Sequence, residues 1–270
     1  MTCPAMSSRQ LSRRRFLTLP LILTLEPVAA ALARSESGRL RYECDVGVLY
    51  NALRYRMTGT VDERIDRAGG RYEVRIEGQG TGFDNRAEAS GVFRDGRWVP
   101  LRGRSWAKIA GREGRAEISY DPDRRVAHYR SRSETFFRGR LRVVDDVVAF
   151  PVGAHVDDMV SAILNHADGY WLPQAGGVLE TRMVRRRRAP REGSEETSGE
   201  YRAEIVPVVL KLVPGSGDGK QTALFDMTGF SAWALPDRPA RIVFEVDGRP
   251  EVVTARLMYG STVTIRFGAG

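Results

Sequence analysis

Three histidines are the first candidates for chemistry, because imidazole serves both as a metal ligand and as an acid–base catalyst near neutral pH. They are His128, His155 and His166. In the motif His-Val-Asp-Asp, His155 and Asp157 could supply two metal ligands. A structural or catalytic metal site needs at least three protein ligands. Asp157 and Asp158 also precede a helical pattern, where a carboxylate caps the first turn. We therefore expect helix capping, and no metal or other cofactor.

Two further side chains could act as nucleophiles. The sequence Gly-Phe-Ser-Ala-Trp at residues 229–233 begins like the nucleophile elbow of hydrolases, but Trp233 replaces the second glycine that the sharp turn requires. Cys44 alternates with Leu40 and Tyr42, which predicts a buried and unreactive thiol. We therefore expect no enzymatic activity, and a hydrolase ranks third among the functions considered.

Alternating apolar and charged residues predict strands through most of the chain. Leu40, Tyr42, Cys44 and Val46 fall on one face of such a strand, and charged residues separate them. Gly69-Gly70 and Asp247-Gly248 supply turns between strands. The pattern recurs at residues 53–57, 72–76, 116–120, 242–246, 253–257 and 263–267. These features predict a mainly β fold, an antiparallel curved sheet of about ten to twelve strands with one solvated face.

One segment has helical periodicity instead. Its apolar residues recur at spacings of three and four between Val156 and Ala167, and include Val160 and Leu164. We expect a short amphipathic helix that covers the concave side of the sheet.

The N-terminus predicts export. Residues 12–17 read Ser-Arg-Arg-Arg-Phe-Leu and resemble the twin-arginine signal of bacteria, which Arg13, Arg14, Phe16 and Leu17 would carry. The apolar run that follows spans only about ten residues and is too short for a transmembrane helix. Small residues at two alternating positions, Ala31 and Ala33, predict cleavage after Ala33. The expected partners are the twin-arginine translocase and signal peptidase, and the expected location is the periplasm or another exported compartment.

Residues 34–270 are expected to form a single exported β domain. Removing residues 1–33 takes away four arginines and one glutamate, which reduces the net charge from +8 to +5. Because the remaining arginines alternate with acidic residues, we expect no nucleic-acid partner. Arginines at 185–188 open a charged segment that predicts a flexible loop at about 185–200; contact with an anionic lipid surface is the alternative.

Several stretches resemble a family of bacterial exported proteins that is known only as a domain of unknown function. The two most informative stretches are FRDGRWVPLRGRS, which contains the turn at residues 95–102, and FPVGAHVDDMVSAILNH, which contains the helix start at residues 158–162. The three others are RYECDVGVLYNALRYRMTGTVDE, AEISYDPDRRVAHYR and ARIVFEVDGRPEVVTARLMYG. That family is similar in shape to the LolA and LolB lipoprotein carriers. The resemblance implies an open half barrel around an apolar cavity, with a helix that closes its mouth.

Two functions from different classes remain open. The first is noncatalytic binding or carriage of an apolar ligand, a lipid or acyl chain, and the second is an envelope assembly or scaffolding protein with a filled core and partner-binding loops. The volume inside the sheet distinguishes them, because an internal cavity of a few hundred Å³ favours a ligand. The side chains expected to line it are Val160, Leu164, Tyr42, Tyr55 and Phe244. Oligomeric state stays open.

Overall fold

The computed structural model describes residues 35–135, 137–187, 195, 197, 201–213, 219–231 and 233–269. The predicted export signal and cleavage site, with Arg13, Arg14, Phe16, Leu17, Ala31 and Ala33, lie outside these residues, as does most of the charged segment after Arg187. No helix in the described part of the chain is long and apolar enough to cross a membrane.

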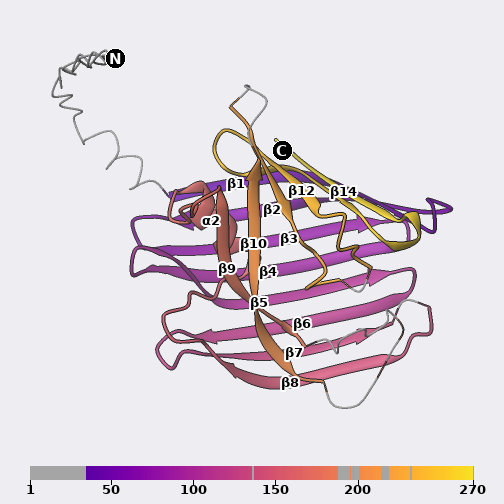
Figure 1. The fold of residues 1–270 in the computed structure, drawn as a ribbon, viewed down its shortest axis with the longest axis horizontal. Helices are drawn as coiled ribbons and strands as arrows, with labels where there is room; N and C mark the ends of the chain where they lie inside the picture. The colour runs from indigo at the N-terminus through magenta and orange to yellow at the C-terminus, as the bar shows by residue number, and fades with distance from the viewer. Residues whose placement is uncertain are drawn as a thin grey trace, which may run out of the picture.

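Two runs of consecutive strands form the fold (Figure 1). The first run comprises β1 (Ser35–Val48), β2 (Leu53–Asp66), β3 (Arg71–Gly80), β4 (Phe83–Arg94), β5 (Arg97–Ile109), β6 (Arg112–Asp121), β7 (Val126–Glu134) and β8 (Leu141–Ala149). The helix α2 (Met159–Ala167) follows. The second run comprises β9 (Val178–Arg186), β10 (Ala203–Val213), β11 (Gln221–Phe225), β12 (Ala240–Phe244), β13 (Pro250–Arg256), the 3-10 turn η1 (Met258–Gly260) and β14 (Thr262–Ala269).

All the strands belong to one antiparallel sheet. Within each run every strand pairs with its neighbours in sequence, and β1 also pairs with β14, so that β8 and β9 are the two edges. The mainly β, antiparallel fold predicted from sequence is confirmed. The predicted strand count is too low, because the described residues contain fourteen strands. Strands such as β4, which reads FDNRAEASGVFR, are rich in residues of low β propensity, and their alternation is hard to detect.

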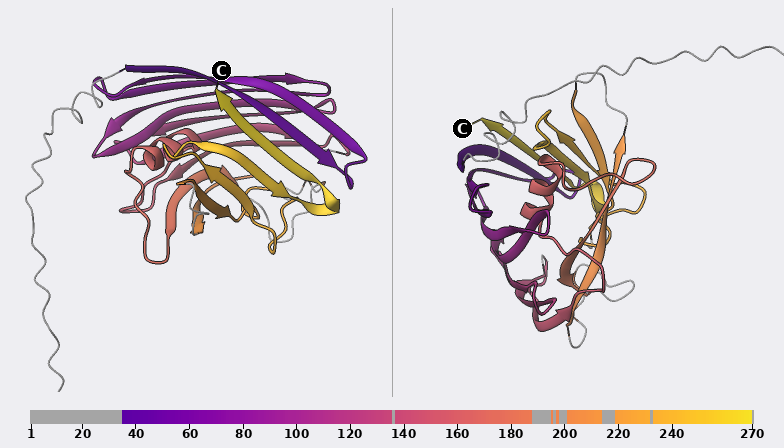
Figure 2. Two further views of the ribbon diagram at one scale, coloured as in Figure 1. Left: turned by 90° about the horizontal axis from the view of Figure 1, so that it is seen from above. Right: turned by 90° about the vertical axis from the view of Figure 1, so that its left-hand side faces the viewer.

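The sheet is rolled so that its edges approach each other. In Figure 2 the two runs of strands form walls that converge at β8 and β10, with α2 between them. Tyr120 and Ala127 from the first run pack with Val184 from the second. The backbone N–H of Ala203 donates to Oδ2 of Asp146 at 2.9 Å, which joins β10 to β8. Side chains therefore close a barrel that the backbone leaves open.

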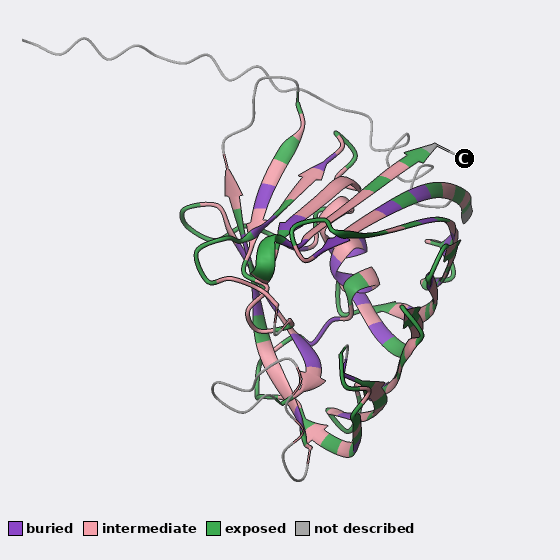
Figure 3. Ribbon diagram, turned by 90° about the vertical axis from the view of Figure 1, so that its right-hand side faces the viewer, coloured by how far each residue is buried: buried purple, intermediate pink, exposed green. Residues whose placement is uncertain are grey.

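The helix α2 begins directly after its N-cap residue, Asp158. Asp158 has extended backbone angles, and its Oδ1 accepts from the N–H of Ser161 at 2.7 Å. The N–H of Asp158 donates in turn to Oγ of Ser161 at 3.0 Å, which completes a capping box. Capping by an aspartate is confirmed, although the helical turns begin at Met159 and not at Val156. Figure 3 shows the buried face of this helix turned toward the interior of the molecule.

A buried polar network fixes the start of α2 to both walls. Oδ2 of Asp157 accepts from Nη2 of Arg97 on β5 at 2.5 Å and from Oγ1 of Thr181 on β9 at 2.5 Å. About two turns further along, the amide of Asn165 bonds to both the N–H and the carbonyl of Trp98, at 2.8 and 2.9 Å. All five side chains are largely buried. The helix position relative to the sheet is therefore set by hydrogen bonds as well as by packing.

Cys44 lies in the main core, as its alternation predicted. It is 3% exposed and packs with Met57 and Val61. Burial, and secondarily the charge of Asp45, raises the pKa of its thiol to about 11. Such a thiol stays protonated at neutral pH and does not act as a nucleophile.

Candidate functional site

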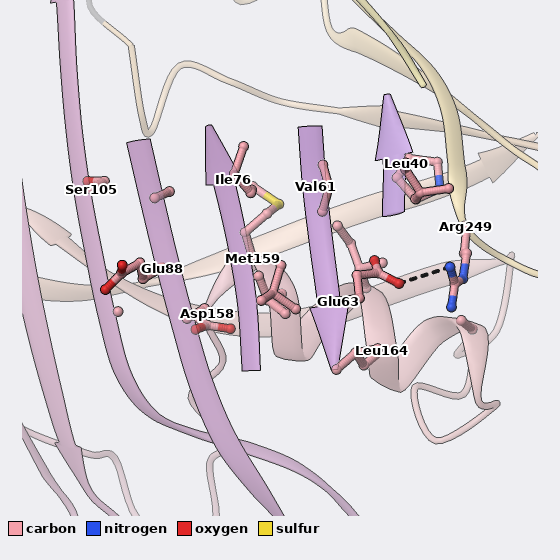
Figure 4. Close-up of a pocket in the computed structure, with 18 of the residues that line it drawn as sticks. Leu40, Val61, Glu63, Ile76, Glu88, Ser105, Asp158, Met159, Leu164 and Arg249 are labelled. Carbon is pink, nitrogen blue, oxygen red and sulfur yellow. Dashed lines mark ion pairs between the residues drawn. The ribbon is translucent and has the colours of Figure 1, made fainter. Parts of the chain in front are cut away.

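A cavity of about 620 Å³ lies between the concave face of β1–β6 and the helix α2. Figure 4 shows Val61 and Glu63 of β2 on one side of it, and Met159 and Leu164 of α2 on another. Most of its wall is hydrocarbon, and charged side chains contribute at its margins. An internal space of this size and character can accommodate a small apolar molecule.

The register of the sheet creates this space. Paired residues form two rows across the strands, and every member lines the cavity. One row is Leu40, Val61, Ile76, Ala87, Ser105 and Ala116, and the adjacent row is Glu63, Val74, Ala89, Gly103 and Ile118. Bulky side chains fill the β1–β3 end of these rows, whereas small ones on β4 and β5, and Ala116 on β6, leave room above the sheet.

The helix and the second run of strands supply the opposite wall. Val160, Ile163 and Leu164 come from one side of α2, at the spacing of a single helical face. Pro250 of β13 and Phe267 of β14 line the cavity as well. The ligand-sized space is therefore a half-open cavity bordered by segments from both halves of the chain.

Two ion pairs mark one end of the cavity. Arg249 pairs with Glu63 at 2.9 Å, and Arg67 pairs with Asp168 at 2.8 Å. In the second pair both side chains are only 14% exposed, and the other oxygen of Asp168 accepts from the indole N–H of Trp98 at 2.8 Å. These contacts tie the end of α2 to β2 and β5.

Asp158 also lines the cavity and is electrostatically unusual. Its Oδ2 atom is buried and has no well-aligned hydrogen-bond donor among the described residues. Burial raises the pKa of this carboxyl group to about 6, against the opposing effect of hydrogen bonds from Ser161 and from the N–H of Val160. Burial also raises the pKa of the Tyr72 and Tyr120 hydroxyls, and the negative charge of Asp158 adds to both shifts.

The raised pKa of Asp158 predicts a measurable pH effect on stability. A carboxyl group that binds its proton more tightly when folded stabilises the fold as the pH falls through about 6. Relative to Asp158→Asn, which keeps an efficient N-cap, the wild type should gain about 1 kcal/mol of unfolding free energy between pH 7 and pH 5. Urea unfolding of both proteins at the two pH values measures this difference. A constant difference would contradict the burial of this carboxylate.

The residues predicted to line a ligand site separate into two groups. Val160 and Leu164 are in the cavity wall, whereas Tyr42, Tyr55 and Phe244 lie outside it. Tyr42 is on the same inner face of β1 as Leu40, where its ring lies over Gly59 and Gly78 and its hydroxyl donates to Asn85 at 2.6 Å. Glycine leaves space there for an aromatic ring, so Tyr42 packs against the neighbouring strands β2 and β3.

The other two aromatic residues have different neighbours. Tyr55 packs in the main core near Gly82 of the β3–β4 turn. Phe244 contacts His166 with ring centroids 4.5 Å apart, in the separate core between α2 and the second run of strands. Alternation identified these inward-facing side chains but did not indicate which core each would join.

The remaining candidates for chemistry are dispersed. His155 lies at a separate hollow, and burial together with Arg97 lowers its pKa. His128 pairs with Asp145 on the outer face at 2.6 Å, and burial lowers the pKa of His166. Oγ of Ser231 accepts from the N–H of Trp233 at 3.1 Å. In the part of the chain that the structure describes, no three His, Cys, Asp or Glu side chains are grouped as metal ligands.

The loop predicted at about residues 185–200 begins later than expected, because β9 extends to Arg186. Arg185 and Arg186 belong to β9, and Arg185 pairs with Glu204 of β10 at 2.6 Å. The N–H of Arg187 continues the pairing by donating to the carbonyl of Arg202 at 2.7 Å. Cross-strand ion pairs thus extend the hairpin into residues that composition alone assigned to a loop.

Sequence reasoning missed the floor of the cavity. Ala87 and Ala89 alternate on β4, and Gly103 on β5 and Ala116 on β6 are the other small residues that line the cavity. Their alignment across β4–β6 depends on register, which turn lengths and a bulge near Ser90 determine.

Comparison with known proteins gives a distant structural likeness. No protein-family profile matches the chain, and no curated protein sequence matches it. Among solved structures, the chain is similar to a beta-barrel-like protein of domain of unknown function DUF1849 from Brucella abortus, at 10% sequence identity and a TM-score of 0.44. The match covers 88% of this chain and 98% of that chain.

Proposed function

We propose that this protein binds an apolar molecule, a lipid or acyl chain, between β1–β6 and α2 and carries it without chemical change. The cavity of about 620 Å³ is the observation that carries this proposal. Small-molecule sites typically enclose roughly 300–1,000 Å³ behind mainly apolar walls. A scaffold whose core is filled is less well supported, because the space above Ala87, Ala89 and Ala116 is not occupied by side chains.

The expected affinity suits reversible carriage. Each methylene group transferred from water gains about 0.8 kcal/mol, so eight to ten of them gain roughly 6 to 8 kcal/mol. A gain of about 8 kcal/mol corresponds to micromolar binding before any cost, and the several kcal/mol that association costs weaken it toward millimolar unless polar contacts contribute. A carrier must release its ligand, and binding in this range permits release.

The proposed place of action is the periplasm or another exported compartment. The arginine motif at residues 12–17 and the small residues Ala31 and Ala33 support transport by the twin-arginine translocase and cleavage by signal peptidase. The resemblance to exported carriers of the LolA and LolB shape is consistent with this location. Anionic membrane surfaces are possible docking partners for the arginines at 185–188.

Lipid analysis of the purified protein tests the proposal. Leu164 is 5% exposed and faces the cavity, so Leu164→Trp should block the site at an overpacking cost of about 1–3 kcal/mol. Leu172 is 74% exposed and outside the wall, so Leu172→Trp is the matched control. Each protein is purified from its native envelope and extracted with organic solvent, and the extract is analysed by mass spectrometry.

We expect an apolar molecule in the wild type and in Leu172→Trp, and a strong loss in Leu164→Trp. Extracts without any such molecule, together with no binding of the neutral fluorophore N-phenyl-1-naphthylamine, would reject carriage. Mass spectrometry of the same samples also reads the N-terminus, which the export proposal places near Arg34.

A further inference from the structure

Negatively charged groups outnumber positively charged groups in the wall of the cavity. Four carboxylates and two guanidinium groups of the wall are not paired on the outer face of the sheet: Glu63, Asp158, Asp168 and Asp247, and Arg67 and Arg249. Glu88 and Arg104 also border the cavity, but they pair with Arg75 and Glu117 on the outer face. The imbalance makes the site unfavourable for an anionic ligand group.

Each guanidinium group already has a carboxylate partner. Arg67 pairs with Asp168 and Arg249 with Glu63, while Arg104 pairs with Glu117 at 3.1 Å on the outer face. A ligand carboxylate or phosphate would have to displace one of these partners, and the displaced carboxylate would lose its own interaction.

Asp158, unlike these arginines, has no oppositely charged partner among the ion pairs described above. Its Oδ1 atom accepts from the N–H of Ser161, and the N–H of Val160 also stabilises the carboxylate, whereas Oδ2 is buried at the cavity wall with no well-aligned donor among the described residues. A buried acceptor without a donor is costly, and a ligand that supplies the donor removes that cost. With a pKa of about 6, the carboxyl group is mainly ionised at pH 7.5 and attracts a positive charge.

The absence of a side chain at Gly103 leaves an approach to this atom. A Cβ built at Gly103, on β5, would lie 4.0 Å from Oδ2 of Asp158. Any larger side chain in that row would therefore extend toward the carboxylate. The glycine instead leaves the space between β5 and the start of α2 to the cavity, which Gly103 also lines.

We infer that the apolar ligand of this cavity carries a hydrogen-bond donor, an amine or an alcohol group, that binds Oδ2 of Asp158. This inference rests on the proposed function and adds the polarity of the ligand. The hydrocarbon part lies along the two rows of β1–β6, and the donor group lies at the N-terminal end of α2. Amine and alcohol ligands share this contact and differ in charge, so the test includes both.

Calorimetric titration at pH 7.5 compares 1-dodecylamine, 1-dodecanol and dodecanoate, which share one alkyl chain. The wild type should bind the amine at least about tenfold more tightly than the carboxylate, with the alcohol between them. Asp158→Asn keeps an efficient cap and replaces the charge, so it should lose this preference. Asp45→Asn, which removes a carboxylate on the outer face of β1 and outside the cavity wall, should retain it.

The outcomes separate the two proposals. Equal binding of all three compounds by the wild type, or an unchanged preference in Asp158→Asn, would overturn the donor inference and leave apolar carriage standing. Binding of none of the three would overturn both.

Discussion

Asp157→Ala is expected to lower the unfolding free energy by about 3–5 kcal/mol, the cost of removing one partner from a buried ion pair. Asp157 is 1% exposed and bonds to Arg97, whose side chain is 11% exposed, and to Thr181. Without the carboxylate, the guanidinium group of Arg97 stays buried with no compensating charge. The loss also separates the start of α2 from β5 and β9, which destabilises the helix side of the cavity.

Urea denaturation measures this effect, and a surface ion pair provides the control. Asp45 pairs with Arg56 at 2.7 Å and with Arg266 at 3.1 Å, and its side chain is 34% exposed. Asp45→Ala should cost less than about 1 kcal/mol, because water screens exposed pairs. Equal losses in the two variants would show that the Asp157 network contributes no more than a surface contact.

The sequence predicted those parts of the fold that depend on local patterns. Alternation placed Leu40, Tyr42 and Cys44 on the inner face of β1, and the pair Asp157-Asp158 indicated the start of the helix. Each of these features depends on residues within one or two turns of each other. A period of two and a capping carboxylate are therefore readable without the tertiary structure.

The cavity and its polar anchors depend on residues far apart in sequence. Asn165 forms a hydrogen bond with Trp98, 67 residues away in sequence, and β1 pairs with β14 at the opposite end of the chain. Ala89 and Gly103 create space only because the register places them side by side. Periodicity gives the face that a side chain occupies, but not its neighbours, so it put Tyr42 and Phe244 on the inner face without indicating that they lie outside the cavity wall.

The second large effect concerns ligand binding. Ala116→Trp should reduce the affinity for an apolar probe at least about tenfold, because the indole would fill the space above β6 without interrupting the strand. Ser119, on the outer face of the same strand, is exposed, so Ser119→Trp is a matched control that should bind normally. Fluorescence titration with N-phenyl-1-naphthylamine measures all three proteins. Equal affinity in Ala116→Trp and the wild type would place any binding elsewhere.

The most direct test of apolar binding in this cavity is a chain-length series. Calorimetric titration of the wild-type protein with straight-chain 1-alkanols, from hexanol to tetradecanol, measures the contribution of each methylene group. If the cavity holds the alkyl chain, affinity should rise about fourfold per methylene, the equivalent of about 0.8 kcal/mol, until the chain fills the space and the increase stops. An affinity that does not depend on chain length, or no binding by any member of the series, would contradict the account.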